Sequence, residues 1–171
     1  MNWDALGAVG EIVGAGAVVL TLVYLALQVR MSAKQQSIES YRNVNEEFNR
    51  IVSIWYDLEK AGMIIRAWSN WSEATAQEKN VLAIYFIQLS NHMQTLYSMW
   101  KNDALGELDY LKQEENFLGQ LATDGGTQWW ATFSNIAGPE FSSRISQKLQ
   151  TQDTVPFSTA IPWTNVEDWK I

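Results

Sequence analysis

The stretch GEIVGAGAVVLTLVYLALQVR, residues 10–30, decides the fold. It carries no charged residue between positions 12 and 27, and its flanks extend the apolar span to roughly residues 5–29. A helix of about 20 residues crosses the hydrocarbon core of a bilayer, which is about 30 Å thick. Buried core helices are usually shorter and carry a polar face, which is missing here before Gln28. The sequence therefore predicts a transmembrane helix within residues 1–30.

A cleaved export signal is the main alternative for this segment. Such a signal needs basic residues before its apolar run and a small-residue cleavage site after it. The run is preceded by Met-Asn-Trp-Asp, which contains no Lys or Arg, and is followed by Gln28, Val29 and Arg30. We therefore expect the segment to stay in the chain as an anchor.

The charged residues around the span predict its orientation. Arg30 and Lys34 follow it closely, whereas Asp4 and Glu11 precede its apolar centre. Positive charge gathers on the cytoplasmic side of membrane helices, so the N-terminus is expected outside and the remaining chain in the cytoplasm. Trp3 is the expected anchor at the outer interface, and Arg30 and Lys34 are the inner anchors.

Small residues form a regular line along the same helix. Gly7, Gly10, Gly14, Ala17 and Thr21 follow one another at intervals of three, four, three and four. Such a seam lets helix backbones approach closely in lipid, and its seven-residue repeat favours a left-handed crossing. Membrane helices are also rich in small residues in general, which is the simpler explanation. We expect self-association through this seam, giving a homo-oligomer within the bilayer.

Glu11 lies beside the seam. If the helix begins near Trp3, this carboxylate lies about 12 Å along it, at about 1.5 Å per residue. An ionisable group at that depth is costly unless it reaches water, a partner or a pore. Glu11 either extends to the outer surface or forms a ring at the entrance of an oligomeric pore.

Beyond Arg30 the sequence predicts an all-α domain, residues 31–150, followed by a docked tail, residues 151–171. Apolar residues at helical spacing extend the first helix to about Gly62. Thr75 and Glu78 have the spacing of a capping box. Asp124-Gly-Gly126 is expected to break the chain between two helices. The expected domain helices are 31–62, 63–71, 76–102, 108–122, 128–137 and 139–149.

Composition argues against most chemical functions. The 171 residues include no cysteine and a single histidine, His92, and carry a formal net charge of −7. The absence of cysteine excludes disulfides and thiolate nucleophiles, and a single histidine disfavours a multi-histidine metal site. An acidic chain is a poor partner for nucleic acid. No phosphate-binding glycine loop or nucleophile motif occurs. We expect no enzymatic activity, catalytic residue, metal or cofactor.

Three groups of side chains are candidates for chemistry. His92 is expected at the surface or at the edge of the core. The acidic pairs 46–47 and 114–115 lack the Glu-x-x-His spacing of di-metal bundles, so a metal site there is not expected. A set of seven aromatic residues is expected mainly in the core, with a ligand pocket as the alternative: Trp55, Tyr56, Trp68, Trp71, Trp100, Trp129 and Trp130.

The first 45 or so residues resemble a family of small, uncharacterised bacterial proteins. That family has a W-x-A-[IL]-G-A-[IV]-G-E-x-[IV]-G-A start, a Y-L-A-x-Q-[IV]-R membrane exit and an all-helical remainder. The matching residues here are Trp3, Ala5, Leu6, Gly7, Gly10, Glu11, Gly14, Tyr24, Leu25, Ala26, Gln28 and Arg30. The resemblance implies a bacterial inner-membrane protein and implies no activity.

Three functions are compatible with these features. The first is a membrane-anchored, self-associating scaffold or interaction protein. The second is an ion channel or pore built from the N-terminal helices, with Glu11 near its outer entrance. The third is a sensor that binds an unknown small molecule in the helical domain.

Overall fold

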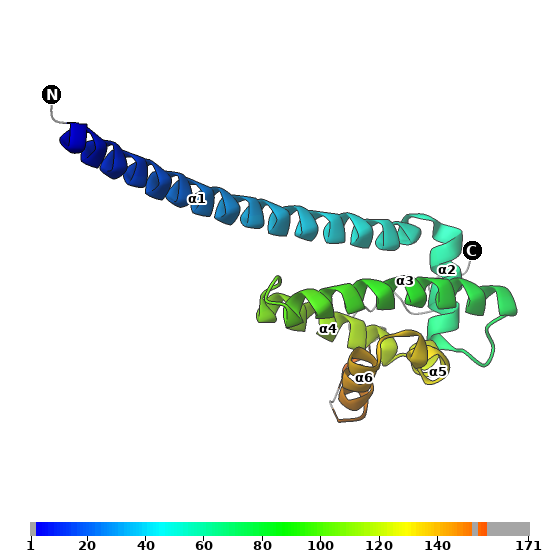
Figure 1. Cartoon of the computed structure of the whole chain (residues 1–171). Helices are drawn as coiled ribbons and strands as arrows, with labels where there is room; N and C mark the ends of the chain where they lie inside the picture. The colour runs from blue at the N-terminus through cyan, green and yellow to red at the C-terminus, as the bar shows by residue number, and fades with distance from the viewer. Residues whose placement is uncertain (1–2, 152–153, 157–171) are drawn as a thin grey trace. The chain divides into compact units, whose positions relative to one another are not determined.

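The computed structural model describes residues 3–151 and 154–156, without the side chains of residues 3–9, 12 and 37. This part of the chain is helical and contains no strand, so the all-α prediction is confirmed. Figure 1 shows the order of the helices. Their bounds are α1 Trp3–Val52, η1 Ser53–Tyr56, α2 Leu58–Ser69, α3 Ala76–Lys101, α4 Glu107–Leu121, α5 Asp124–Phe133, η2 Ser134–Ile136 and α6 Pro139–Thr151.

The first helix is continuous from the apolar segment into the polar sequence that follows. The chain divides into two compact units, residues 1–43 and 44–171, and α1 contributes to both. In the second unit, the last turns of α1 bury Val44 and Ile51 against the helical domain. The predicted boundary at residue 30, between the transmembrane helix and the helical domain, marks the end of the apolar span. It stays a prediction.

The expected end of the first helix near Gly62 is wrong. α1 ends at Val52, and the 3-10 turn η1 leads to α2. Asp57 has an extended backbone, and its carboxylate accepts a hydrogen bond from the backbone N–H of Lys60 at 3.2 Å. This N-cap satisfies one of the free donors at the start of a new helix. Gly62 lies inside α2, so it does not end a helix.

The predicted start and end of the third helix are confirmed. The Thr75 hydroxyl accepts a hydrogen bond from the backbone N–H of Glu78, and the Glu78 carboxylate accepts one from the backbone N–H of Thr75. This reciprocal pair is a capping box, which satisfies two donors that a helix leaves open. At the other end, Asn102 caps α3.

The break near residue 124 lies slightly earlier than expected. α4 ends at Leu121, and the Thr123 side chain caps α5, so Gly125 and Gly126 lie within the first turn of α5. A Cβ atom at Gly125 would overlap the carbonyl oxygen of Ala67 in α2. These glycines therefore allow α5 to approach α2 and the end of α4, and they do not break the helix.

Helices α2 to α6 pack around an aromatic core. α3 packs against both α2 and α4, while α5 packs against α2 and α4, and α6 against α4 (Figure 1). Phe86 of α3 stacks on Trp129 of α5 with 5.0 Å between ring centroids. The Gln120 backbone carbonyl accepts from the indole N–H of Trp68 at 2.9 Å. Buried aromatic rings thus join α2, α3, α4 and α5, and each ring contributes a large buried area.

Candidate membrane helix and buried ion cluster

α1 is the one helix in the described part of the chain that is long and apolar enough to cross a membrane. Its most apolar window has a mean hydropathy of 1.7, and no part of that window is buried. Leu20, for example, is 73% exposed. A core helix of comparable composition would bury most of this surface. The apolar segment of α1 is therefore left uncovered by the described residues.

The seam residues for which side-chain surroundings are described lie on this open surface. A Cβ atom added at Gly10 or Gly14 would meet nothing within 4 Å. No packing among the described residues explains these glycines, although each costs a helix about 1 kcal/mol relative to alanine. The Thr21 hydroxyl donates to the carbonyl oxygen of Ala17 at 2.8 Å, so this polar group is satisfied within the helix. Gly7 lies in the same helix.

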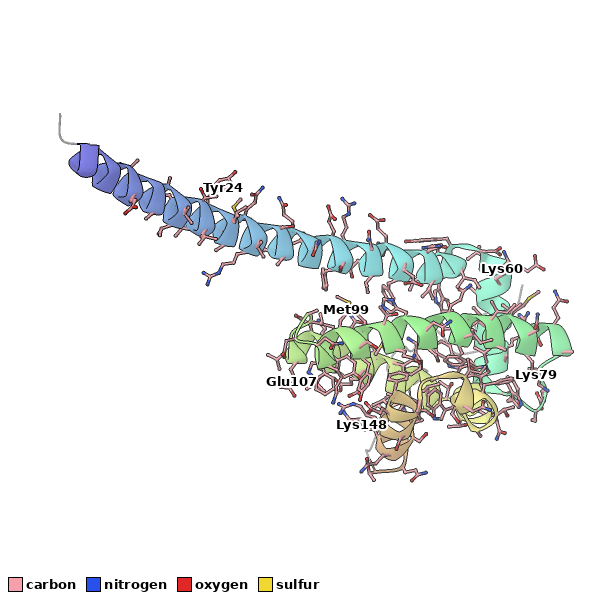
Figure 2. The ribbon with its side chains drawn as sticks, in the orientation of Figure 1. Tyr24, Lys60, Lys79, Met99, Glu107 and Lys148 are labelled. Atoms are coloured by element: carbon pink, nitrogen blue, oxygen red, sulfur yellow. The ribbon has the colours of Figure 1, made fainter. Side chains whose placement is uncertain are left out.

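The charged residues at the two ends of the apolar segment are exposed. Glu11, Arg30 and Lys34 all lie on the solvent-accessible surface of α1. Tyr24 projects from the same helix and is 64% exposed (Figure 2). The side chain of Trp3 and nearly all of the predicted tail lie outside the described residues.

A buried carboxylate in the helical domain forms the densest polar cluster of the described residues. Glu114 of α4 is fully buried, and α6 supplies both of its cationic partners. Arg144 donates from Nε to Oε1 at 2.5 Å and from Nη2 to Oε2 at 2.9 Å. Lys148 donates from Nζ to Oε2 at 2.6 Å, and the Tyr110 hydroxyl donates to Oε1 at 2.7 Å. The carboxylate therefore accepts four hydrogen bonds.

The cluster favours the charged form of its carboxylate. Burial pushes the pKa of Glu114 up, but the hydrogen bonds from Arg144, Lys148 and Tyr110 outweigh it and hold the pKa below its ordinary value. Burial, together with the adjacent carboxylate, raises the pKa of the Tyr110 hydroxyl. The Arg144 guanidinium also lies over the Trp100 ring, 4.9 Å from its centroid. These contacts fasten α6 to α3 and α4.

The composition of this cluster suits a structural role. Both cations are engaged by the same carboxylate, and Tyr110 stacks on Trp100 with 4.7 Å between ring centroids. In the sequence Glu114 is one half of an acidic pair, and this role was not predicted. The available signal was the spacing of Arg144 and Lys148, which places two cations on one face of α6.

His92 is buried, so its expected place at the surface or core edge is wrong. It is 3% exposed and stacks on Phe48 of α1 with 5.2 Å between ring centroids. Its Nδ1 atom has no hydrogen-bond partner among the described residues. Burial lowers the pKa of His92, and the Glu47 carboxylate opposes this shift. The neutral imidazole therefore serves as a packing residue beneath the end of α1.

The aromatic set predicted for the core is mostly found there. Trp68, Trp129 and Trp130 are buried, and Trp55, Trp71 and Trp100 pack against the core, whereas Tyr56 is 88% exposed.

Two surface hollows of about 370 and 320 Å³ occur in the described part of the chain. The larger is lined by Arg66 and Glu78, which pair with each other at 2.5 Å. No group of three or more potential metal-ligating side chains occurs among the described residues.

These features define an all-α domain joined to a helix that is long and apolar enough to span a membrane. No protein-family model, curated protein or solved structure matches the chain.

Proposed function

We propose that the chain is a membrane-anchored helical scaffold that associates with copies of itself through α1. The observation that carries this proposal is that no part of the apolar window of α1 is buried. In water this surface would cost about 25 cal/mol for each Å² left exposed, and a bilayer removes that cost. The bacterial inner membrane, with the domain in the cytoplasm, is the proposed location because Arg30 and Lys34 follow the span.

The glycines support self-association as well as anchoring. Gly10 and Gly14 weaken an isolated helix, and a Cβ atom at either position would meet no described atom within 4 Å. Close packing against a second helix would compensate for that weakness, because small residues allow van der Waals contact between the backbones. The proposed interface comprises Gly7, Gly10, Gly14, Ala17 and Thr21. The internal hydrogen bond of Thr21 leaves its methyl group free to pack.

The mass of the detergent-solubilised particle tests this proposal. The wild type is expected to be an oligomer, and replacing both Gly10 and Gly14 with Leu is expected to shift it toward the monomer. Gly16→Leu is the matched control, since Gly16 is equally open but lies off the seam. A monomeric wild type, or equal dispersal by the control, would contradict the seam.

A pore is the second candidate, and the exposure of Glu11 on the apolar helix favours it. A carboxylate at the entrance of a water-filled passage would attract cations. Ion flux into liposomes measures this function. The wild type is expected to conduct and Glu11→Gln to conduct less; no flux through the wild-type oligomer would remove the pore and leave the scaffold intact.

A further inference from the structure

We infer that residues 28–38 of α1 form a parallel, in-register coiled coil with a second copy of this chain. This inference rests on the proposed self-association of the membrane helix and extends it beyond the bilayer. The seven-residue register of the seam continues without interruption after Thr21. Its next positions are Tyr24, Gln28, Met31, Gln35 and Ile38.

Two apolar residues of this register are exposed, and the second lies beyond the part of the helix that lipid would cover. Met31 is 67% exposed and Ile38 is 60% exposed. Ile38 lies 11 residues beyond Leu27, about 16 Å along the helix at about 1.5 Å per residue. That distance takes it out of the hydrocarbon core. A coiled-coil partner would cover Met31 and Ile38, which occupy equivalent positions in successive heptads.

The charges beside the seam select a parallel partner. Lys34 lies immediately before a core position of the seam register, and Glu39 lies immediately after the next core position. Two residues with these positions, five apart in the sequence, face each other across two parallel helices that are in register. Each Lys34 would face Glu39 of the other copy, which gives two equivalent ion pairs. In an antiparallel arrangement, the positions that precede core residues face each other, so Lys34 would not face Glu39.

Lys34 and Glu39 of one chain do not pair with each other. Residues five apart point about 140° away from each other, so Lys34 cannot pair with Glu39 of the same chain. Neither side chain forms an ion pair with another described residue. Gln28 and Gln35 fill the alternate core positions. Polar residues at core positions reduce the stability of a coiled coil but specify its register. That is sufficient for a short segment whose chains are already brought together by the proposed association of the membrane helices.

Single-cysteine cross-linking in the membrane tests the register, and the chain has no native cysteine to remove. Gln35→Cys and Ile38→Cys are expected to form disulfide-linked dimers several-fold faster than Ala33→Cys and Ser40→Cys, which lie on the opposite face. Equal rates at all four positions would overturn the coiled coil. Faster cross-linking at Lys34→Cys and Tyr41→Cys than at Gln35→Cys would overturn this register in favour of its neighbour.

Charge exchange tests the ion pairs. Lys34→Glu and Glu39→Lys are each expected to slow cross-linking at Gln35→Cys, and the double exchange is expected to restore it. Mixing the two single variants is expected to give mixed dimers in excess of random pairing. Random mixing would contradict the ion pairs. The wild type could be oligomeric while residues 28–38 show no faster cross-linking at the core positions. In that case this inference fails, and the proposed membrane seam stands.

Discussion

At the scale of single residues, Glu114 has the most demanding environment. A fully buried carboxylate is tolerated when charged and hydrogen-bonded partners replace its lost water. Arg144, Lys148 and Tyr110 supply these partners. The energetic consequence is asymmetric: the intact cluster adds modest stability, but removal of one member leaves uncompensated charge inside the protein.

Neutralising Glu114 is therefore expected to destabilise the domain strongly. Glu114→Gln leaves two cations facing an amide and should lower the free energy of unfolding by about 3 kcal/mol. Chemical unfolding followed by tryptophan fluorescence measures the change. Glu115→Gln is the matched control, because Glu115 is exposed, and its effect should stay within about 0.5 kcal/mol. Equal effects at both positions would show that the cluster contributes no special stability.

His92 is expected to make stability depend on pH. Because burial lowers its folded-state pKa, the unfolded chain binds the proton more readily. The contribution of His92 to the free energy of unfolding is constant above the pKa of about 6.5 that a histidine has in the unfolded chain. Below that pH the free energy of unfolding decreases, by at most about 1.4 kcal/mol per pH unit.

His92→Phe keeps an aromatic ring against Phe48 and removes the titration. Subtracting the unfolding free energies of the variant from those of the wild type between pH 5 and 8 isolates this contribution. A difference that does not change with pH would contradict it.

What the sequence reveals about single residues depends on the range of their contacts. Thr75 and Glu78 were predicted as a cap because their contact is local, three residues apart. Glu114 and Arg144 are 30 residues apart, and one sequence without helix positions does not show that they meet. His92 was misplaced because its burial depends on Phe48 from another helix.

At the scale of elements, the helices could be predicted where caps and periodicity agreed. α3 and α6 matched because Thr75 and Pro139 mark their starts. The end of α1 was missed because neither Gly nor Pro marks it, and the N-cap at Asp57 was not recognised. Gly125 was interpreted as a breaker because its actual role, close approach to α2, depends on tertiary packing.

The contact between α5 and α2 can be tested at that glycine. Gly125→Ala would place a methyl group against the Ala67 carbonyl and 2.9 Å from Leu82 Cδ2, which forces the helices apart. We expect a loss of about 1–3 kcal/mol in the free energy of unfolding.

Gly62→Ala in α2 is the matched control. Its new methyl group would meet only the flexible end of Arg66 at 3.3 Å, and alanine favours the helix. That variant should be as stable as the wild type or more stable. A neutral Gly125→Ala would mean that the two helices can adjust without cost.

At the scale of the whole molecule, the two units have different requirements for stability. Among the described residues, the buried hydrophobic core begins at Val44 and lies within the second unit. The described part of the first unit, in contrast, is exposed along its length. The proposed membrane attachment and the folding of the domain therefore depend on separate parts of the sequence, although one continuous helix contributes to both.

Removing residues 1–43 is accordingly expected to give a domain that folds without detergent and remains monomeric. Sedimentation should report one copy, and circular dichroism should report the helices of the second unit. A shorter chain, residues 53–171, is the control. It also loses Val44, Phe48 and Ile51, whose burial contributes about 1.5–3 kcal/mol each when complete, so it should be markedly less stable. If the 44–171 domain assembles to the same copy number as the full chain, the oligomer is held by the domain, and the proposed seam in α1 is not its main interface.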